Sequence, residues 1–258
     1  MEIERTKPRR GFGLRAAILA IISGLINLFI NSTFFSLWLK DQLSRIFANL
    51  TGGEVDYLVF VVQALFSGVL LLLLVLSVIW LEKPVNMRQF FKIGPVDFKG
   101  LGLIVLCVAI LDALEIGFLR RMVYEPVRLF LVSLGLPGSA SLSVSFTPDP
   151  HLIVLNILLL LLIFWIEVPE EIFFRGYVQN HLQDSVGLNV ALFLGAFIWT
   201  FWHFFALADF LHILVLGLAF SLVFRLRQNT TPLAIWHPLG NRLLLLFSLI
   251  SMALARSQ

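Results

Sequence analysis

Ionisable side chains stand within apolar stretches of this chain, and the densest group is the segment Glu167–Arg175. A charged group at the centre of a bilayer costs roughly 2.5–3.5 kcal/mol on insertion scales, so such residues favour a functional role. Glu171 and Arg175 are four residues apart and can form an ion pair on a helix. Glu170 projects about 100° away around the helix, which leaves its carboxylate able to exchange a proton. Pro169 removes a backbone donor, so we expect a kink or a wider helical turn there.

Two further polar groups follow on other apolar stretches. His203 has Trp199 one helical turn before it, and His237 has Asn241 one turn after it. Residues four apart lie on the same face of a helix, and polar side chains in a membrane turn toward the bundle interior. We therefore expect a carboxylate pair, an imidazole, and an imidazole with an amide to converge from three helices. A carboxylate that acts as general base beside oriented donors in a dry pocket predicts a hydrolytic site.

Each group also has a structural explanation. The pair Glu171–Arg175 could be a salt bridge that only supports the fold, and His203 could be a hydrogen-bonding group between helices. His237 and Asn241 could likewise hold two helices together. The recurrence of ordered polar groups on three helices favours one joint site over three unrelated contacts.

Three motifs occur in a fixed order: Glu170-Glu171-x-x-x-Arg175, Trp199-x-x-x-His203 and His237-x-x-x-Asn241. In this order they resemble the CPBP family of intramembrane proteases, which includes the type II CAAX prenyl endopeptidases and bacteriocin self-immunity proteins. The resemblance covers about Ile163–Leu243. One residue departs from the family pattern, because Trp199 stands where the family usually has Phe. The substitution keeps an aromatic wall, so we expect it to be conservative.

The resemblance implies a role for each motif residue. Glu170 and His203 would activate a water molecule for attack on a peptide carbonyl, and His237 and Asn241 would stabilise the resulting oxyanion. It also implies a membrane-associated or lipidated protein or peptide as substrate. Other intramembrane protease classes lack their motifs here, since the chain contains no HExxH, no Gly-x-Ser-Gly and no Gly-x-Gly-Asp.

The need for a metal is left open by the sequence. Glu171 would orient the site together with Arg175, but Glu171, His203 and His237 could also ligate a divalent metal such as zinc with one open position. Without an HExxH motif we favour a metal-independent glutamate mechanism, and no other cofactor is expected.

The elements that must position these residues are transmembrane helices. Of the 258 residues, 59% are hydrophobic and 14% are charged, and the mean hydropathy is +0.93. A soluble domain carries roughly 25% charged residues, so the fold expected is an all-α, polytopic helical bundle. A span needs about 20 mostly apolar residues. Seven stretches qualify: Leu14–Leu39, Tyr57–Trp80, Leu101–Leu119, Leu152–Phe174, Leu188–Leu207, Phe210–Phe224 and Pro232–Leu254.

The segment Val127–Leu136 could add an eighth, shorter span or lie flat at the interface. It belongs to the linker Val123–Pro150, which we expect to be the longest non-helical stretch. No repeat or second domain is visible, so residues 1–258 are predicted to form one transmembrane domain with its motifs in residues 163–243.

The positive charges indicate an orientation. Basic residues cluster before the first apolar run and again between Lys83 and Lys99, which places the N-terminus in the cytoplasm under the positive-inside rule. No basic stripe interleaved with exposed aromatics is present, so nucleic acid is not an expected partner.

The three side chains are expected at unequal depths in the membrane. At about 1.5 Å per residue, Glu170 would lie ~20 Å, His203 ~24 Å and His237 ~9 Å from the expected cytoplasmic helix ends. These depths assume helix ends near Gln183, Gly187 and Thr231. Helix tilt, a longer last loop or different helix ends would be needed for the three side chains to meet.

Two alternative functions remain compatible with the sequence. Asp112, Glu115, Glu167 and Glu170 could form a proton or cation relay in a transporter, although no inverted repeat supports one. A non-catalytic scaffold or immunity protein could keep the motifs for folding alone. Asn27 and Asn31, four residues apart in the first stretch, are expected to form hydrogen bonds between helices.

Overall fold

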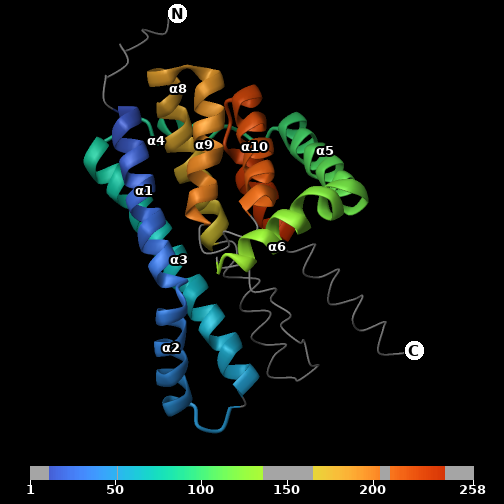
Figure 1. Ribbon diagram of the computed structural model, residues 1–258. Coiled ribbons are helices and arrows are strands. Elements are labelled where there is room, and N and C mark those ends of the chain that lie inside the picture. The colour runs from blue at the N-terminus through green and yellow to red at the C-terminus, as the bar shows by residue number, and fades with distance from the viewer. Residues whose placement is uncertain (1–11, 51, 136–164, 204–209, 242–258) are drawn as a thin grey trace, which may run out of the picture.

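The computed structural model describes residues 12–50, 52–135, 165–203 and 210–241 (Figure 1). Every regular element in these ranges is a helix and none is a strand, which confirms the all-α prediction. Three of the described helices are long and apolar enough to cross a membrane, over Gly13–Ile30, Glu54–Glu82 and Phe210–Arg227, and two shorter ones are apolar. Together these helices indicate an integral membrane protein.

The first predicted span is two helices. Helix α1 (Phe12–Ile30) ends before Asn31, and α2 (Thr33–Ile46) begins after it. The hydroxyl of Ser32 accepts a hydrogen bond from the Phe35 backbone N–H at 3.2 Å and caps the second helix, because serine competes for backbone groups and favours such a position. The stretch Leu14–Leu39 is therefore broken near residue 31. Helix α3 (Gly52–Glu82) returns alongside both (Figure 1).

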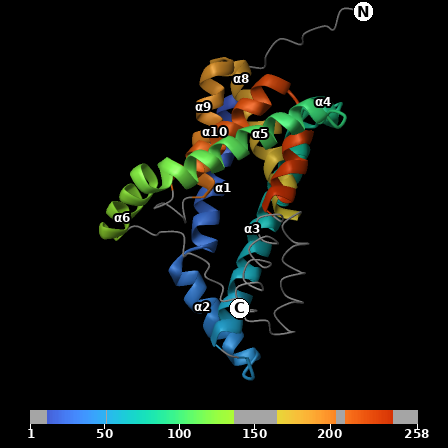
Figure 2. The ribbon, with the colours of Figure 1, turned by 90° about the vertical axis from the view of Figure 1, so that its right-hand side faces the viewer.

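The third predicted span continues without a loop into the predicted linker. Helix α5 (Phe98–Leu114) passes directly into a π-helix, η1 (Glu115–Tyr124), and then into α6 (Glu125–Ser133), as Figure 2 shows. The prediction of a non-helical linker is wrong up to Ser133, and residues 136–150 lie outside the described ranges. Helix α6 has nine residues and no buried side chain. At about 1.5 Å per residue it is too short to cross the bilayer core.

A tight hairpin positions two of the predicted motifs. Residues 165–171 are helical and continue through the π-helix η2 (Ile172–Gln179) into α8 (Asn180–Val186). The chain reverses at Gly187, whose φ of +82° is one that L side chains rarely adopt, and enters α9 (Leu188–Trp202). Such a φ favours glycine. The hairpin packs against α1 and α10 (Phe210–Arg227).

A second turn, after α10, is recessed into the bundle. Residues 231–241 are helical, and Thr230 before them donates its hydroxyl to the Phe91 carbonyl at 2.8 Å. The same carbonyl lies so close to Gly176 that a Cβ there would be 2.6 Å from it. Thr230 thus lies at the level of Gly176, inside the bundle relative to the Gly187 turn. Helix α4 (Met87–Phe90) leads into this contact.

Candidate active site

The carboxylates of the first motif are buried on the helix that contains residues 165–179. The wider turn predicted near Pro169 is present, but it begins at Ile172, where the π-helix η2 starts. Oε2 of Glu171 lies 3.6 Å from Nε of Arg175, and both side chains are fully buried. This confirms the predicted ion pair one turn apart.

Two hydrogen bonds join this helix to residues 231–241. Nδ1 of His237 lies 2.9 Å from Oε1 of Glu171, and the amide nitrogen of Asn241 donates to Oε1 of Glu167. His237 and Asn241, as well as Glu167 and Glu171, are four residues apart, so the two helices are bridged twice at the same spacing. The recessed turn at Thr230 makes this register available, since it brings His237 to the depth of Glu171.

Glu170 faces α9, the helix that carries Trp199. The indole N–H of Trp199 donates a hydrogen bond to Oε1 of Glu170. Nε2 of His203 lies 3.9 Å from the same carboxylate oxygen, and Nδ1 of His203 is 3.0 Å from the Trp199 carbonyl. A carbonyl can only accept, so Nδ1 carries the hydrogen and, in the neutral ring, Nε2 offers its lone pair toward Glu170.

The separation of His203 and Glu170 suits a water molecule between them. It is too long for a direct hydrogen bond. A water at ~2.8 Å from both atoms would subtend about 90° at its oxygen, which is a workable angle for two hydrogen bonds. Glu170 is 3% exposed and the His203 side chain is 22% exposed, so such a water would be held on the accessible side of the carboxylate.

Trp199 supplies the expected aromatic face and also a hydrogen-bond donor. Its indole binds Glu170, and the guanidinium carbon of Arg175 lies 4.8 Å from its ring centroid. Phe220 of α10 lies on the cation too, at 5.7 Å. A phenylalanine could supply the ring face toward Arg175 but not the N–H toward Glu170.

The predicted site residues therefore meet, with two additions. The six residues predicted to be catalytic are joined by side-chain contacts across three helices. Trp199 joins them through its indole N–H, and Glu167 joins them through Asn241. The sequence suggests Glu167 only as a member of a proton or cation relay. The available signal was its position four residues before Glu171, on the same helix face.

A metal could be held by a different trio from the one expected. Ligand atoms of Glu170, Glu171 and His237 all lie within 4.8 Å of one another in the described part of the chain. Glu170 thus takes the place that the sequence gave to His203, although it projects from another helix face than Glu171. Two carboxylates and an imidazole are a suitable donor set for zinc, and the same groups are already engaged with Trp199 and with each other.

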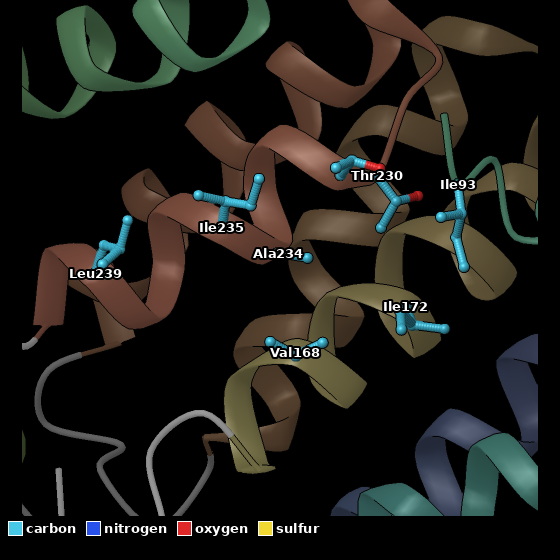
Figure 3. Close-up of a pocket in the computed structure, with 8 residues that line it drawn as sticks. Ile93, Val168, Ile172, Thr230, Ala234, Ile235 and Leu239 are labelled. Carbon is cyan, nitrogen blue, oxygen red and sulfur yellow. The ribbon is translucent and has the colours of Figure 1, made fainter. Parts of the chain in front are cut away.

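An apolar cavity of about 260 Å³ borders the two bridged helices (Figure 3). Val168 and Ile172 line it from one helix, and Ala234, Ile235 and Leu239 line it from the other. Ile93, Thr230 and Thr231 complete the lining. Val168 and Ile172 stand next to Glu167 and Glu171 in the chain. The cavity therefore lies beside the contact between the two helices that these glutamates join by hydrogen bonds.

Other predicted polar residues are placed only in part. Asn27 donates its amide to the Trp202 carbonyl at 2.9 Å and accepts from the Ser67 hydroxyl at 2.7 Å, and Asn31 donates to the Asn27 carbonyl at 2.9 Å. Asn31 also donates to the Ser67 hydroxyl at 3.5 Å, so the expected hydrogen bonds between helices are confirmed for both residues. The side chains of Asp112 and Glu115 lie outside what the structure describes.

Comparison with known proteins supports the resemblance seen in the motifs. Residues 152–243 match the family model of type II CAAX prenyl endopeptidase Rce1-like proteins. The matched segment contains all three motifs. Neither the search of curated proteins nor the search of solved structures gave a match.

Proposed function

Starting from the match of residues 152–243 to the Rce1-like type II CAAX prenyl endopeptidases, we propose that this membrane protein is an intramembrane endopeptidase that cleaves the tail of a lipidated protein. The observation that carries the proposal is the placement of Glu170. Its Oε1 accepts from Trp199 and lies 3.9 Å from Nε2 of His203. That geometry leaves room for one activated water in a buried setting.

The proposed hydrolysis begins with this water. His203 accepts one hydrogen bond from it and Glu170 takes its other proton as general base. The water oxygen bonds to the peptide carbonyl carbon, and the carbonyl π electrons move onto oxygen to form a tetrahedral oxyanion. When this intermediate collapses, the C–N bond breaks and the proton held by Glu170 passes to the leaving amine. Glu170 thereby returns to its carboxylate form.

His237 and Asn241 would stand on the oxyanion side. Nδ1 of His237 donates to the Glu171 carboxylate at 2.9 Å, which fixes the ring. In the protonated ring Nε2 carries a second N–H, which can donate to the oxyanion. Glu171 and Arg175 would hold this ring in place as a buried ion pair. Donors fixed before the reaction stabilise developing charge without reorganisation, and losing one typically costs about 10²–10³ in kcat.

The apolar cavity between Val168 and Leu239 would receive the isoprenoid chain of the substrate. Six of its eight lining residues are aliphatic, and it lies beside the helix contact that contains His237 and Glu171. Filling it by Ala234→Phe should raise the KM for a prenylated peptide while leaving the low activity on the same unprenylated peptide unchanged.

The site would open toward the cytoplasm. The basic residues of the α3–α5 connection lie at the same end of the bundle as the start of α1, where Gly13 packs against Ser185. Figure 1 shows the start of α1 at that end, near α4 and α8. Under the positive-inside rule this end is cytoplasmic, and we take the whole chain to be one transmembrane domain around the site.

The decisive experiment uses the purified full-length protein and fluorogenic prenylated and unprenylated peptides. We expect Glu170→Gln and His203→Ala each to lower kcat by about 10²–10⁴, the usual contribution of a general base and its partner. Glu54→Gln makes the same chemical change in the first turn of α3 and serves as the matched control. Normal cleavage by both active-site variants would refute the proposed activation of water.

A transporter function predicts a different result in the same variants. Proton or cation flux in proteoliposomes that requires Glu170, together with no cleavage of any peptide by the wild type, would replace the protease proposal. Loss of a cellular phenotype in Glu170→Gln would exclude a purely structural scaffold, since that substitution keeps the shape of the side chain.

A further inference from the structure

Five polar residues form a single stripe along the helix that carries the candidate site. They recur every four residues, as Glu167, Glu171, Arg175, Gln179 and Gln183. The helix is α-helical over residues 165–171, π-helical over Ile172–Gln179 and α-helical again over Asn180–Val186. A spacing of four slightly overshoots one α-turn and falls short of one π-turn, so the two kinds of turn offset each other and keep the stripe straight.

The same stripe holds nearly all the unsatisfied polar atoms of the described interior. Within residues 12–50, 52–135, 165–203 and 210–241, the buried side-chain nitrogen and oxygen atoms without a hydrogen-bond partner belong to the five stripe residues and to Ser221 of α10. Natural proteins pair more than about 90% of their buried polar groups. These buried polar atoms without a hydrogen-bond partner, here called orphan atoms, lie mostly along one line, so we expect them to share one kind of partner.

Burial shows where the stripe leads. Glu171, Arg175, Gln179 and Ser221 are all fully buried, whereas Gln183 is partly exposed in α8. Gln179 and Ser221 adjoin, because the Gln179 amide nitrogen donates to the Ser221 carbonyl at 2.9 Å. The stripe therefore runs from the surface near Gln183, past α10, to the carboxylate of Glu171.

The orphan atoms alternate in character along this line. They are Oε2 of Glu171, which accepts, the three nitrogens of Arg175, which donate, Oε1 of Gln179, which accepts, and Nε2 of Gln183, which donates. The Cβ atoms of residues four apart on a helix stand about 5–6 Å from one another, which is close to the length of two hydrogen bonds in series. Glu171 and Arg175 already form an ion pair at 3.6 Å. A water molecule both donates and accepts, so one water between Arg175 and Gln179 and another between Gln179 and Gln183 would satisfy their neighbours.

We propose that a file of internal water molecules runs along this stripe from Gln183 to the Glu171–Arg175 pair and supplies water and protons to the candidate site. Hydrolysis consumes one water per turnover, and the carboxylates of Glu170 and Glu171 belong to residues that are at most 3% exposed. The existence of the file stands on the buried polar atoms alone. Its role in supplying the nucleophile rests on the proposed endopeptidase function.

Radiolytic hydroxylation in H₂¹⁸O tests the file, because hydroxyl radicals formed from internal water label the side chains beside it. The reporters are Trp199 and Phe220, whose rings lie on the Arg175 guanidinium. The matched controls are Trp202 and Phe174, equally buried rings that pack on each other. After rapid mixing with H₂¹⁸O, we expect labelled oxygen at Trp199 and Phe220 and far less at the two controls.

A block in the file tests the route. Gln179→Leu keeps the side-chain size and removes the orphan acceptor, so it should slow ¹⁸O exchange at Trp199 and Phe220 about tenfold and lower kcat with little change in KM. Ser221→Ala removes a hydroxyl without a described partner, so the protein should fold as well as the wild type and exchange several-fold more slowly. Ser23→Ala is its control, since that buried hydroxyl already donates to the Ala20 carbonyl.

The outcomes separate the two proposals. Labelling of Trp199 and Phe220 no higher than that of Trp202 and Phe174 would overturn the file, as would unchanged exchange in both Gln179→Leu and Ser221→Ala. Strong labelling that depends on Gln179, in a protein that cleaves no peptide, would keep the file and overturn the endopeptidase function.

Discussion

The indole of Trp199 gives the sharpest test of how the site is built. It touches two parts of the site at once, because its N–H binds Glu170 and its face lies 4.8 Å from the guanidinium carbon of Arg175. Trp199→Phe separates these contacts. The phenyl ring retains an aromatic face toward Arg175, while the hydrogen bond to the carboxylate is lost.

The expected magnitude follows from that one hydrogen bond. A hydrogen bond to a charged group contributes about 1.5–3 kcal/mol, which corresponds to roughly a tenfold to 150-fold change in rate. The oxygen that loses its donor is the one 3.9 Å from His203, so Glu170 would no longer be held in place for the water. We expect the loss in kcat rather than in KM, because Trp199 does not line the apolar cavity.

The assay compares steady-state cleavage of a prenylated peptide by Trp199→Phe, Trp202→Phe and the wild type. Trp202 is as deeply buried as Trp199 and packs on Phe174, so its variant reports the cost of a shortened indole away from Glu170. Thermal melting of each variant separates lost folding from lost catalysis. Wild-type kcat in Trp199→Phe, or an equal loss in both variants, would refute the positioning role of this indole.

Three further results are expected. Gly176→Ala would place a Cβ 2.6 Å from the Phe91 carbonyl oxygen and should destabilise the protein by about 1–3 kcal/mol. The control Gly102→Ala meets no atom within 4 Å and should be neutral or stabilising. Equal melting temperatures of the two variants would contradict the close packing at the recessed turn. The Arg227 guanidinium, bonded to Asp97 at 2.6 Å, holds the pKa of that carboxyl below its ordinary value. The stabilisation is therefore complete above about pH 4 and is lost as pH falls through the lowered pKa, so the melting penalty of Asp97→Asn should shrink at low pH; a pH-independent penalty would argue against the ion pair. Excess chelator should leave cleavage unchanged if water is activated by the carboxylate and imidazole alone, and a loss that zinc restores would assign a metal to the site.

Much of the site was accessible from local spacing. Glu171 and Arg175 pair because residues four apart share a helix face. Glu170 and His203 meet because they lie at nearly equal distances from Gly187, 17 residues before it and 16 after it. A hairpin of two apolar helices with a tight turn brings such positions together whatever surrounds it.

The meeting of His237 with Glu171 was not accessible in this way. If the helix that contains His237 began at the same depth as α9, His237 would lie much nearer the membrane surface than Glu170 and His203. Thr230 instead bonds to the Phe91 carbonyl, level with Gly176, so the last described helix starts deep in the bundle. A contact between residues 91 and 230 joins segments far apart in the chain, and no local pattern encodes it.

Composition and spacing alone determined that this chain forms apolar helices with ionisable groups on chosen faces, because burial in lipid and helical periodicity act on neighbouring residues. Tertiary structure decided the depth of each helix, and with it which polar atoms meet. Because of these depths, the indole of Trp199 donates a hydrogen bond to Glu170 and the amide of Asn241 donates one to Glu167. Those contacts depend on the packing of whole helices against one another, which is a property of the assembled bundle.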